Sequence, residues 1–521
     1  MTSQKPSENL KRNVTAAAVI ILLMNIVTKL LGFVREIVIA RAFGATMYTD
    51  AYVVAYTLPY SVQQVIGNAI VFVTVPLLTK YIVDDNRGEA NLAANSFLNS
   101  SALLMAAVAL IGVAAAPLLV RITAPNLAAS TALLAVRLTR LMFPTVIFFC
   151  LGMTLTGILN ANRRFTIAAF APAFSSIIII LFVLLTGDSL GIWGLAAGTL
   201  VSFIGFFLIQ LPSSFAAGWR YRFRVSRHND EIRAALVSLV PIILGMSVNQ
   251  VYYILNRFFA SGLAEGSISS LNYGARLAQL PSGIFVSAIA VAIYPLLSEY
   301  AIRGDLVRCR EALERGVGVI LLLAVPAAVG LMILRVPIVR LLFEHGAFTA
   351  DDTLMTSSAL LFYAGGIIAH SLVMLLLRVF FAFSDVKVPV IAGIGGIAVN
   401  IAVSLLTIGG MGHNGLALAT TLASAANMLI FFLYVRKHLP DMAFRPLLIS
   451  CGKIFFASAV MGIAVALTRA LCSGWGDLAL LCVAITVAVA VYLLLAAALR
   501  IREGAWLWEM VKNRFARSAK G

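Results

Sequence analysis

Seven basic side chains lie inside long apolar stretches of the chain, where a charge is costly. A cation at the centre of a bilayer costs about 2.5–3.5 kcal/mol on insertion scales. Seven of them facing lipid would cost roughly 17–25 kcal/mol, which exceeds the net stability of a typical fold. Some could reach the membrane surface, and the others must face a wet cavity or an anion. The seven are Lys29, Arg35, Arg137, Arg140, Arg257, Arg276 and Arg378.

Acidic residues inside the same stretches are few. Glu36 and Asp50 lie near the ends of the first two stretches, and Asp385 lies near the end of the tenth. A cavity lined by these residues is therefore net cationic. This favours an anionic substrate, such as a phosphate or diphosphate, held by arginine forks and the point charge of a lysine. An exporter of cations or drugs would need a buried carboxylate instead.

Two arginines are the strongest candidates for substrate binding. Arg276 lies just before a Leu280–Pro281 step, and we expect it to bind substrate. Arg35 could bind substrate or form a structural bridge to Asp50. Because Arg35 and Glu36 are adjacent, we expect them to point to different sides of a helix.

The remaining arginines leave more alternatives open. Arg137 and Arg140 are three residues apart and share a helix face, so they could be structural or line an inner gate. Arg257 and Arg378 have no obvious partner in the sequence, and each could be structural or line the cavity.

The composition requires a membrane protein. Hydrophobic residues make up 61% of the 521 residues, charged residues 12%, and the mean hydropathy is +0.98. Soluble chains carry about 25% charged residues, so a soluble enzyme, a disordered chain and a disulfide scaffold are excluded. The net charge of +17 is explained by basic membrane loops, and we expect no binding to nucleic acid.

Hydropathy predicts an all-α polytopic protein, since a span needs about 20 mostly apolar residues. Most of the 39 Lys and Arg residues fall in segments on the side of the N-terminus, which predicts that both termini are cytoplasmic. The fourteen predicted spans are 14–40, 50–80, 93–120, 128–159, 166–187, 191–217, 233–262, 268–300, 314–342, 353–383, 388–411, 414–435, 447–470 and 476–499.

An internal repeat relates spans 1–6 to spans 7–12. The segment 76–81 (PLLTKY) matches 295–300 (PLLSEY), and the segment 194–199 (GLAAGT) matches 415–420 (GLALAT). Six spans are an even number, so the repeat is parallel and predicts two lobes that alternate access to a site between them. The predicted domains are an N-terminal lobe (1–225), a C-terminal lobe (226–440), two further spans (441–500) and a basic amphipathic cytoplasmic tail (501–521).

Several motifs resemble the MurJ (MviN) family of lipid II flippases, within the MOP exporter superfamily. They are LGFVRE at 31–36, FG at 43–44, TDA at 49–51, GILNANRRF at 157–165, LPSGIF at 280–285 and FEHGAF at 343–348. The resemblance implies that the protein moves an undecaprenyl-diphosphate-linked precursor from the inner to the outer leaflet of the bacterial cytoplasmic membrane. It also implies cavity roles for Arg35 and Arg276, with Lys29 where the family has arginine, Glu36 where it has aspartate, and Asp50 at the family's acid.

The chain departs from the family pattern at a few positions. Gln63 stands where the family carries a cavity arginine, Ala275 replaces an acid, and Asn256 stands where some members have a sodium-binding aspartate. Residues 66–69 (IGNA) also differ from the family's acidic, glycine-bearing pattern. We count Gln63 with the substrate site, and Asn256 and Asp385 with an ion site. The cargo could therefore be lipid II or another polyprenyl-linked glycan of a capsule or exopolysaccharide.

Other classes fit the sequence less well. A cation-coupled drug exporter is disfavoured by the scarce acids, and a non-transporting scaffold of the cell wall machinery explains neither the repeat nor the cations. The sequence contains no nucleophile–base pair, phosphate-binding glycine loop or metal cluster, so we expect no enzymatic activity and no cofactor. Coupling to the membrane potential, Na⁺ or H⁺ is an expectation from the resemblance. The expected partners are the lipid-linked anionic glycan, membrane lipids and the cell wall synthesis machinery.

Overall fold

The structure is a computed structural model that describes residues 8–223, 230–440 and 444–504. These three ranges are helical and contain no β-strand, because in lipid a helix satisfies its own backbone hydrogen bonds. Residues 505–521, most of the predicted amphipathic tail, lie outside the described residues. By its internal contacts the chain forms two compact units, Met1–Ser269 and Ser270–Gly521. The predicted domain boundaries at 225, 440 and 500 stay a prediction.

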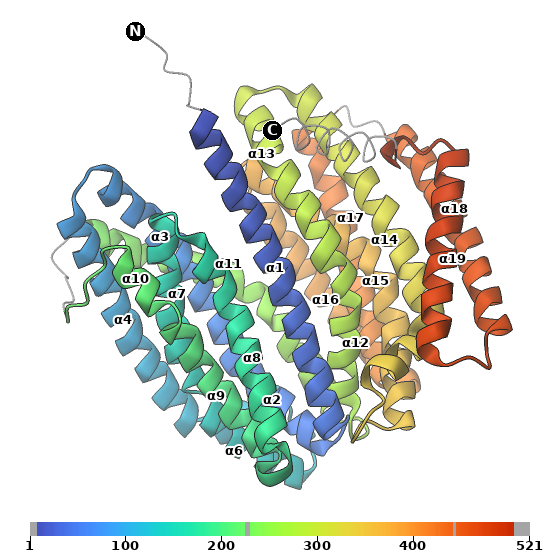
Figure 1. Ribbon diagram of the computed structural model, residues 1–521, viewed down its shortest axis with the longest axis horizontal. Coiled ribbons are helices and arrows are strands. Elements are labelled where there is room, and N and C mark those ends of the chain that lie inside the picture. Colours follow the sequence, from blue (N-terminus) through green and yellow to red (C-terminus); the bar gives the residue numbers. More distant parts are fainter. Residues whose placement is uncertain (1–7, 224–229, 441–443, 505–521) are drawn as a thin grey trace. The chain divides into compact units, whose positions relative to one another are not determined.

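The first unit contains the helices drawn from blue to green in Figure 1. Its long helices pack in sequence-distant pairs: α1 against α8, α2 against α6, α3 and α4 against α7, and α11 against α3. The elements are α1 (Glu8–Phe43), α2 (Met47–Val62), η1 (Gln63–Gly67), α3 (Asn68–Val83), α4 (Arg87–Ala114), α5 (Ala116–Thr123), α6 (Ala129–Met142), α7 (Thr145–Ala161), α8 (Phe165–Leu190), α9 (Ile192–Leu208), α10 (Leu211–Ala216) and α11 (Asp230–Ala260).

The second unit is built around α14 and α15. Helix α15 packs against α14 and α17, α16 packs against α17, and α18 and α19 lie side by side against α14 (Figure 1). Helix α12 begins at the end of the first unit and continues into the second. The elements are α12 (Ser267–Pro281), η2 (Ser282–Val286), α13 (Ser287–Arg303), α14 (Leu306–Phe343), α15 (Ala350–Ala382), α16 (Lys387–Met411), α17 (His413–His438), α18 (Phe444–Leu471) and α19 (Asp477–Ala498).

Each predicted span falls on one helix or on a run of consecutive helices. Within the described residues, eleven segments are long and apolar enough to cross a membrane. The protein is thus a multi-pass membrane protein, and the count of fourteen spans stays a prediction.

The backbone repeats where the sequence does. A five-residue π-helical segment begins at Gln63 in the first unit and at Ser282 in the second, an offset of 219 residues. Gly191 joins α8 to α9 with φ 55° and ψ −136°, and Gly412 joins α16 to α17 with φ 54° and ψ −132°. Side chains with a Cβ avoid this region of backbone angles. Glycine therefore makes the same sharp connection in both halves of the chain.

Candidate functional site

Arg35, on α1, forms an ion pair with its neighbour in the sequence. Its Nη2 atom lies 2.7 Å from Glu36 Oε1, and the side chains are 23% and 8% exposed. The expectation that these two charges point to different sides of the helix is therefore wrong, because the long arginine side chain bends back to the carboxylate. The alternative bridge to Asp50 is not the pairing observed. Arg35 can still attract an anion, but Glu36 partly neutralises its positive charge.

Lys29 lies on the same helix as Arg35. It is exposed and precedes Arg35 by six residues, or about 9 Å along the helix axis. Thr28, beside it, donates a hydrogen bond of 3.2 Å to the backbone carbonyl of Ala169 on α8. The contact with α8 fixes the position of α1, and thereby of both cations.

Asp50, in the first turn of α2, holds the start of α12. Its Oδ2 atom accepts a hydrogen bond from the Gly266 amide at 2.8 Å, and its Oδ1 atom accepts bonds from the Ser269 amide and hydroxyl at 2.8 Å and 2.6 Å. Amides at a helix start lack partners inside the helix, and a negative charge there is favourable. Asp50 is 4% exposed. The carboxylate thus serves as a cap for α12, and its role toward substrate stays a prediction.

Arg257 is a neighbour of this carboxylate. It is buried in the last turn of α11 and interacts electrostatically with Asp50. The sequence offered no partner for Arg257, because the two residues are far apart in the chain. Asn256, the predicted ion ligand, precedes Arg257 on α11 and is half-buried. In the described ranges no cluster of three or more His, Cys, Asp or Glu side chains could hold a metal ion.

Gln63 begins the π-helical segment η1 and belongs to a neutral hydrogen-bond network. Its Nε2 atom donates to Thr145 Oγ1 at 2.9 Å, and its Oε1 atom accepts from the Tyr56 hydroxyl at 3.4 Å. Gln63 is 1% exposed. The position where the family carries a cavity arginine is therefore buried and uncharged in this protein.

A row of tyrosines leads to Gln63 along α2, and the sequence analysis missed it. Tyr52 and Tyr56 stack with ring centroids 6.1 Å apart, and Tyr56 and Tyr60 follow at 5.5 Å. The Tyr52 hydroxyl hydrogen-bonds Thr199 of α9 at 2.9 Å. The spacing of four residues places the three rings on one helix face, so the signal was present in the sequence.

Arg137 and Arg140 both lie on α6 and are exposed. Neither forms an ion pair with any part of the chain that the structure describes. Their spacing puts them on one face, as expected. The choice between a structural role and a gate stays open.

In the second unit, Arg276 and Arg378 have different surroundings. Arg276 is half-buried on α12, five residues before the proline that precedes η2. Arg378, on α15, places its guanidinium 5.6 Å from the ring centre of Tyr294 on α13. A cation over an aromatic face is attracted by the ring. Arg378 therefore has the structural partner that the sequence did not reveal.

Asp385, the other predicted ion ligand, lies between α15 and α16. Its carboxylate accepts a hydrogen bond from the Lys387 amide at 3.0 Å, and His438 Nε2 at the end of α17 lies 3.0 Å away. The His438 hydrogen bond lowers the pKa of the Asp385 carboxyl. The observed contacts connect α16 to α17, and an ion-binding role stays a prediction.

An apolar groove runs along α14, α18 and α19 in the second unit. Its cavity volume is about 580 Å³. The Tyr492 hydroxyl, the main polar group in it, donates to the Leu322 carbonyl at 2.8 Å and is thereby satisfied. The groove is lined by residues that include Leu322, Pro326, Met461, Ala488, Val489 and Leu493. Such a surface suits a flexible hydrocarbon chain rather than a polar ligand.

The repeated helical units and the basic residues within them are those of a membrane transporter of the MOP type. An inward-facing multidrug resistance MATE family transporter of that superfamily matches the fold with a TM-score of 0.67 at 15% identity, covering 82% of this chain and 98% of the other. The solved structure titled lipid II flippase MurJ, inward closed conformation, matches with a TM-score of 0.78 at 25% identity, covering 92% and 98%.

The chain belongs to the lipid II flippase MurJ family, whose model matches residues 39–486. The lipid II flippase MurJ of Burkholderia cenocepacia is 30% identical over 79% of this chain and 82% of its own length. The probable lipid II flippase MurJ of Buchnera aphidicola subsp. Acyrthosiphon pisum is 29% identical over 80% and 83%. The family membership expected from the motifs is confirmed.

Proposed function

We propose that this protein moves lipid II, the undecaprenyl-diphosphate-linked peptidoglycan precursor, from the inner to the outer leaflet of the bacterial cytoplasmic membrane. The observation that carries the proposal is the family match over residues 39–486, because relatives of similar length are named lipid II flippases. The protein is a transporter, and the substrate leaves chemically unchanged.

The charged part of the substrate is the diphosphate. In this proposal Lys29, Arg35 and Arg276 are the residues that bind it. Arginine binds phosphate oxygens through paired N–H donors, and Arg35 can exchange its bond to Glu36 for a bond to the diphosphate. Glu36 then limits how tightly the anion is held, which favours its release.

The hydrocarbon part of the substrate is the polyprenyl tail. The apolar groove along α14, α18 and α19 offers about 580 Å³ of cavity. Because the tail enters it from lipid, which is equally apolar, close packing rather than removal from water favours binding there. We infer that part of the tail lies in this groove while the diphosphate is bound elsewhere in the protein. The tail therefore never has to cross a polar surface.

The transport cycle that fits a two-unit repeat is alternating access. The substrate binds from the inner leaflet, the units rock, and the substrate leaves to the outer leaflet. Reset could draw on the membrane potential, Na⁺ or H⁺, with Asn256 and Asp385 as candidate ion ligands. Both termini are cytoplasmic in this proposal, as the distribution of Lys and Arg predicts, and the cell wall synthesis machinery is the partner that receives the product.

Complementation tests the function. A bacterium depleted of its own lipid II flippase would express this protein as wild type, Arg276→Ala, Arg35→Ala or Arg303→Ala at matched membrane levels. Arg303 is the control, because its side chain is exposed and pairs with Glu299 on its own helix. Growth and exposure of lipid II on the outer leaflet would be measured together.

We expect rescue by the wild type and by Arg303→Ala, and none by Arg276→Ala or Arg35→Ala. Failure of the inserted wild-type protein would exclude lipid II as the cargo in that host. Rescue by Arg276→Ala would leave the function standing and remove Arg276 from the binding site.

A further inference from the structure

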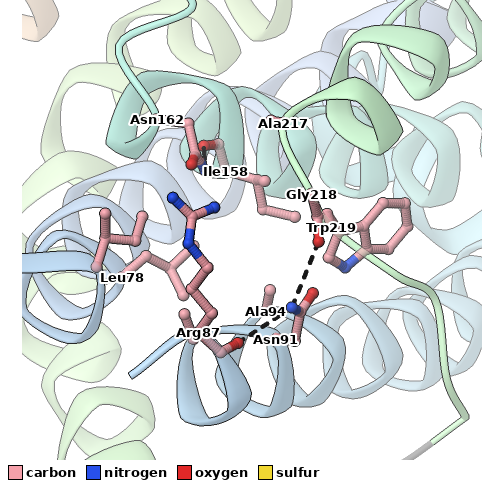
Figure 2. A pocket seen from close by; sticks show the side chains of 11 residues that line it. Leu78, Arg87, Asn91, Ala94, Ile158, Asn162, Ala217, Gly218 and Trp219 are labelled. Carbon is pink, nitrogen blue, oxygen red and sulfur yellow. Dashed lines mark hydrogen bonds between the residues drawn. The ribbon is translucent and has the colours of Figure 1, made fainter. Parts of the chain in front are cut away.

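A second pocket, which contains several polar groups, opens at one end of the first unit and shares no residue with the apolar groove (Figure 2). It is formed by the start of α4, the end of α7 and the segment after α10, with α3 behind them. Its interior volume is about 30 Å³, which is enough for one water molecule or one oxygen atom of a ligand. Including the open mouth, the empty space is about 350 Å³.

Two hydrogen-bond donors face this pocket from different sides. Arg87, the one charged residue among the described residues that line it, extends its guanidinium group across the pocket toward Asn162 (Figure 2). Trp219 lies opposite and is 5% exposed, and its Nε1–H has no acceptor in the described part of the chain. A buried donor without an acceptor is unfavourable, so the pocket is suited to a ligand that accepts hydrogen bonds.

Three asparagines on α4 hold Trp219 in place. They follow at intervals of four residues, which aligns them on one face of the helix. Asn91 Oδ1 accepts from the Arg220 amide at 3.0 Å, Asn95 Nδ2 donates to the Arg220 carbonyl at 2.9 Å, and Asn99 Nδ2 donates to the Arg222 carbonyl at 3.2 Å. The segment after α10 is thereby fixed along α4, and the pocket is preformed.

The surroundings of the pocket are those of a membrane–water interface. Phe215 and Tyr221 are half exposed; Phe215 stacks on Trp219 with ring centroids 5.2 Å apart, and Tyr221 meets it edge-on at 6.1 Å. Aromatic residues of this kind gather at the level of lipid headgroups. Asp84 and Asp85 lie in the turn before α4, but neither lines the pocket. A ligand therefore meets a cation and a neutral donor.

We propose that this pocket binds a phosphate group, held by the Arg87 guanidinium and the Trp219 indole N–H. Phosphate carries several acceptor oxygens and a charge that matches the arginine fork. One oxygen enters the small interior beside Trp219, and the rest of the group stays at the mouth with Arg87. The phosphate could belong to an anionic lipid headgroup or to free inorganic phosphate. In either case it connects the start of α4 to the segment after α10.

Binding can be measured by thermal unfolding of the full-length protein in a maltoside detergent that contains no phosphate. Phosphatidylglycerol, inorganic phosphate, or a glycolipid without phosphate would be titrated in separate experiments. The variants are Arg87→Gln, which removes the charge, and Trp219→Phe, which removes the N–H but keeps an aromatic ring. Arg222→Gln is the matched control, because Arg222 is exposed on the same segment and does not line the pocket.

We expect saturable stabilisation of the wild type by a phosphate-bearing ligand and none by the glycolipid. Arg87→Gln and Trp219→Phe should each weaken the apparent affinity by about tenfold or more, and Arg222→Gln by less than about twofold. Stabilisation by phosphatidylglycerol alone identifies a lipid headgroup, whereas an equal response to inorganic phosphate identifies the free anion. Equal losses in Arg222→Gln and Arg87→Gln, or wild-type affinity in Trp219→Phe, would overturn the proposal. Unfolding temperatures without ligand show whether each variant is folded.

Discussion

Asp50 accepts three hydrogen bonds from the first residues of α12 while it belongs to the first turn of α2. Arg257 supplies a nearby positive charge from a third helix. A carboxylate with this many partners inside the chain has few lone pairs left for a substrate. The structure therefore gives Asp50 a stabilising role. A transport defect caused by a substitution of Asp50 can then have two causes, loss of stability or loss of a contact with the substrate.

Replacing Asp50 with Asn should lower stability by about 1–3 kcal/mol, because buried donors at Gly266 and Ser269 lose acceptors. Thermal unfolding of the purified protein measures this, together with transport. Ser269→Ala removes one of the three bonds and should cost less. A variant Asp50→Asn that unfolds like the wild type but no longer transports would show instead that Asp50 acts on the substrate.

Replacing Gln63 with arginine, the residue that the family resemblance implies at this position, tests a buried site without charge. Gln63→Arg would bury a charge among Tyr56 and Thr145, which provide no negative partner, and an uncompensated buried charge costs about 3–5 kcal/mol. We expect reduced membrane levels and a lower unfolding temperature. Gln64→Arg, at the less buried neighbouring position, is the control and should be milder. Wild-type stability of Gln63→Arg would show that the site can open to water.

Asp385 and His438 give a pH dependence with a defined sign. The pKa of Asp385 lies below its ordinary value of about 3.9, so its stabilising contribution is present above that value and is lost as pH falls through the lowered pKa. The difference in unfolding temperature between wild type and Asp385→Asn should be present at about pH 5 and should shrink as the pH falls below about 3.9. His438→Ala should move this loss to higher pH. A difference that persists unchanged at the lowest pH would contradict the assignment.

At the scale of the elements, the two π-helical segments are the clearest product of the repeat. Each interrupts a long helix shortly after a proline, Pro59 in the first unit and Pro281 in the second. Hydropathy predicted both spans but not these interruptions, because a π-helical turn changes the hydrogen-bond partners without changing the apolar pattern. The Leu–Pro steps carried a signal that the helices would bend. Single π-helical turns are frequent at functional sites, and Gln63 begins one of them.

The first π-helical segment ends at Gly67, a position without space for a Cβ atom. A Cβ at Gly67 would overlap the ring of Phe149 on α7, and that ring is packed between Phe203 and Phe206 of α9. Gly67→Ala should therefore lower stability by about 1–3 kcal/mol. Gly32→Ala, where a Cβ meets nothing within 4 Å, should be neutral or stabilise α1 by up to about 1 kcal/mol. Equal effects in thermal unfolding would show that the ring can move.

At the scale of the whole molecule, the sequence predicted what depends on composition and pattern. Hydropathy predicts the membrane class and the helical fold. Short sequence motifs predict the repeat and the family. The partners of Arg257, Arg378 and Asp385 could not be predicted, because each lies on another helix and no pattern in the chain connects the pairs. The Arg35–Glu36 pair was missed for a different reason, since helix geometry describes Cβ directions and not the reach of a long side chain.

The apolar groove makes a prediction about the path of the substrate. Ala488→Trp would fill part of the groove and remove packing contacts between the groove and the tail. We expect a corresponding fall in lipid II transport without a change in unfolding temperature. Ile485→Trp, exposed on α19 and outside the groove, should transport normally. Equal transport by both variants would place the tail elsewhere.

The packing of α1 also has a consequence for how the protein is made. Its packing partner α8 begins more than a hundred residues later in the chain. At a synthesis rate of about 5–20 residues per second, α1 waits on the order of ten seconds for that partner. During this interval Lys29 and Arg35 must be sheltered by the insertion machinery or held at the membrane surface. Assembly of the first unit is therefore completed late, when α8 arrives.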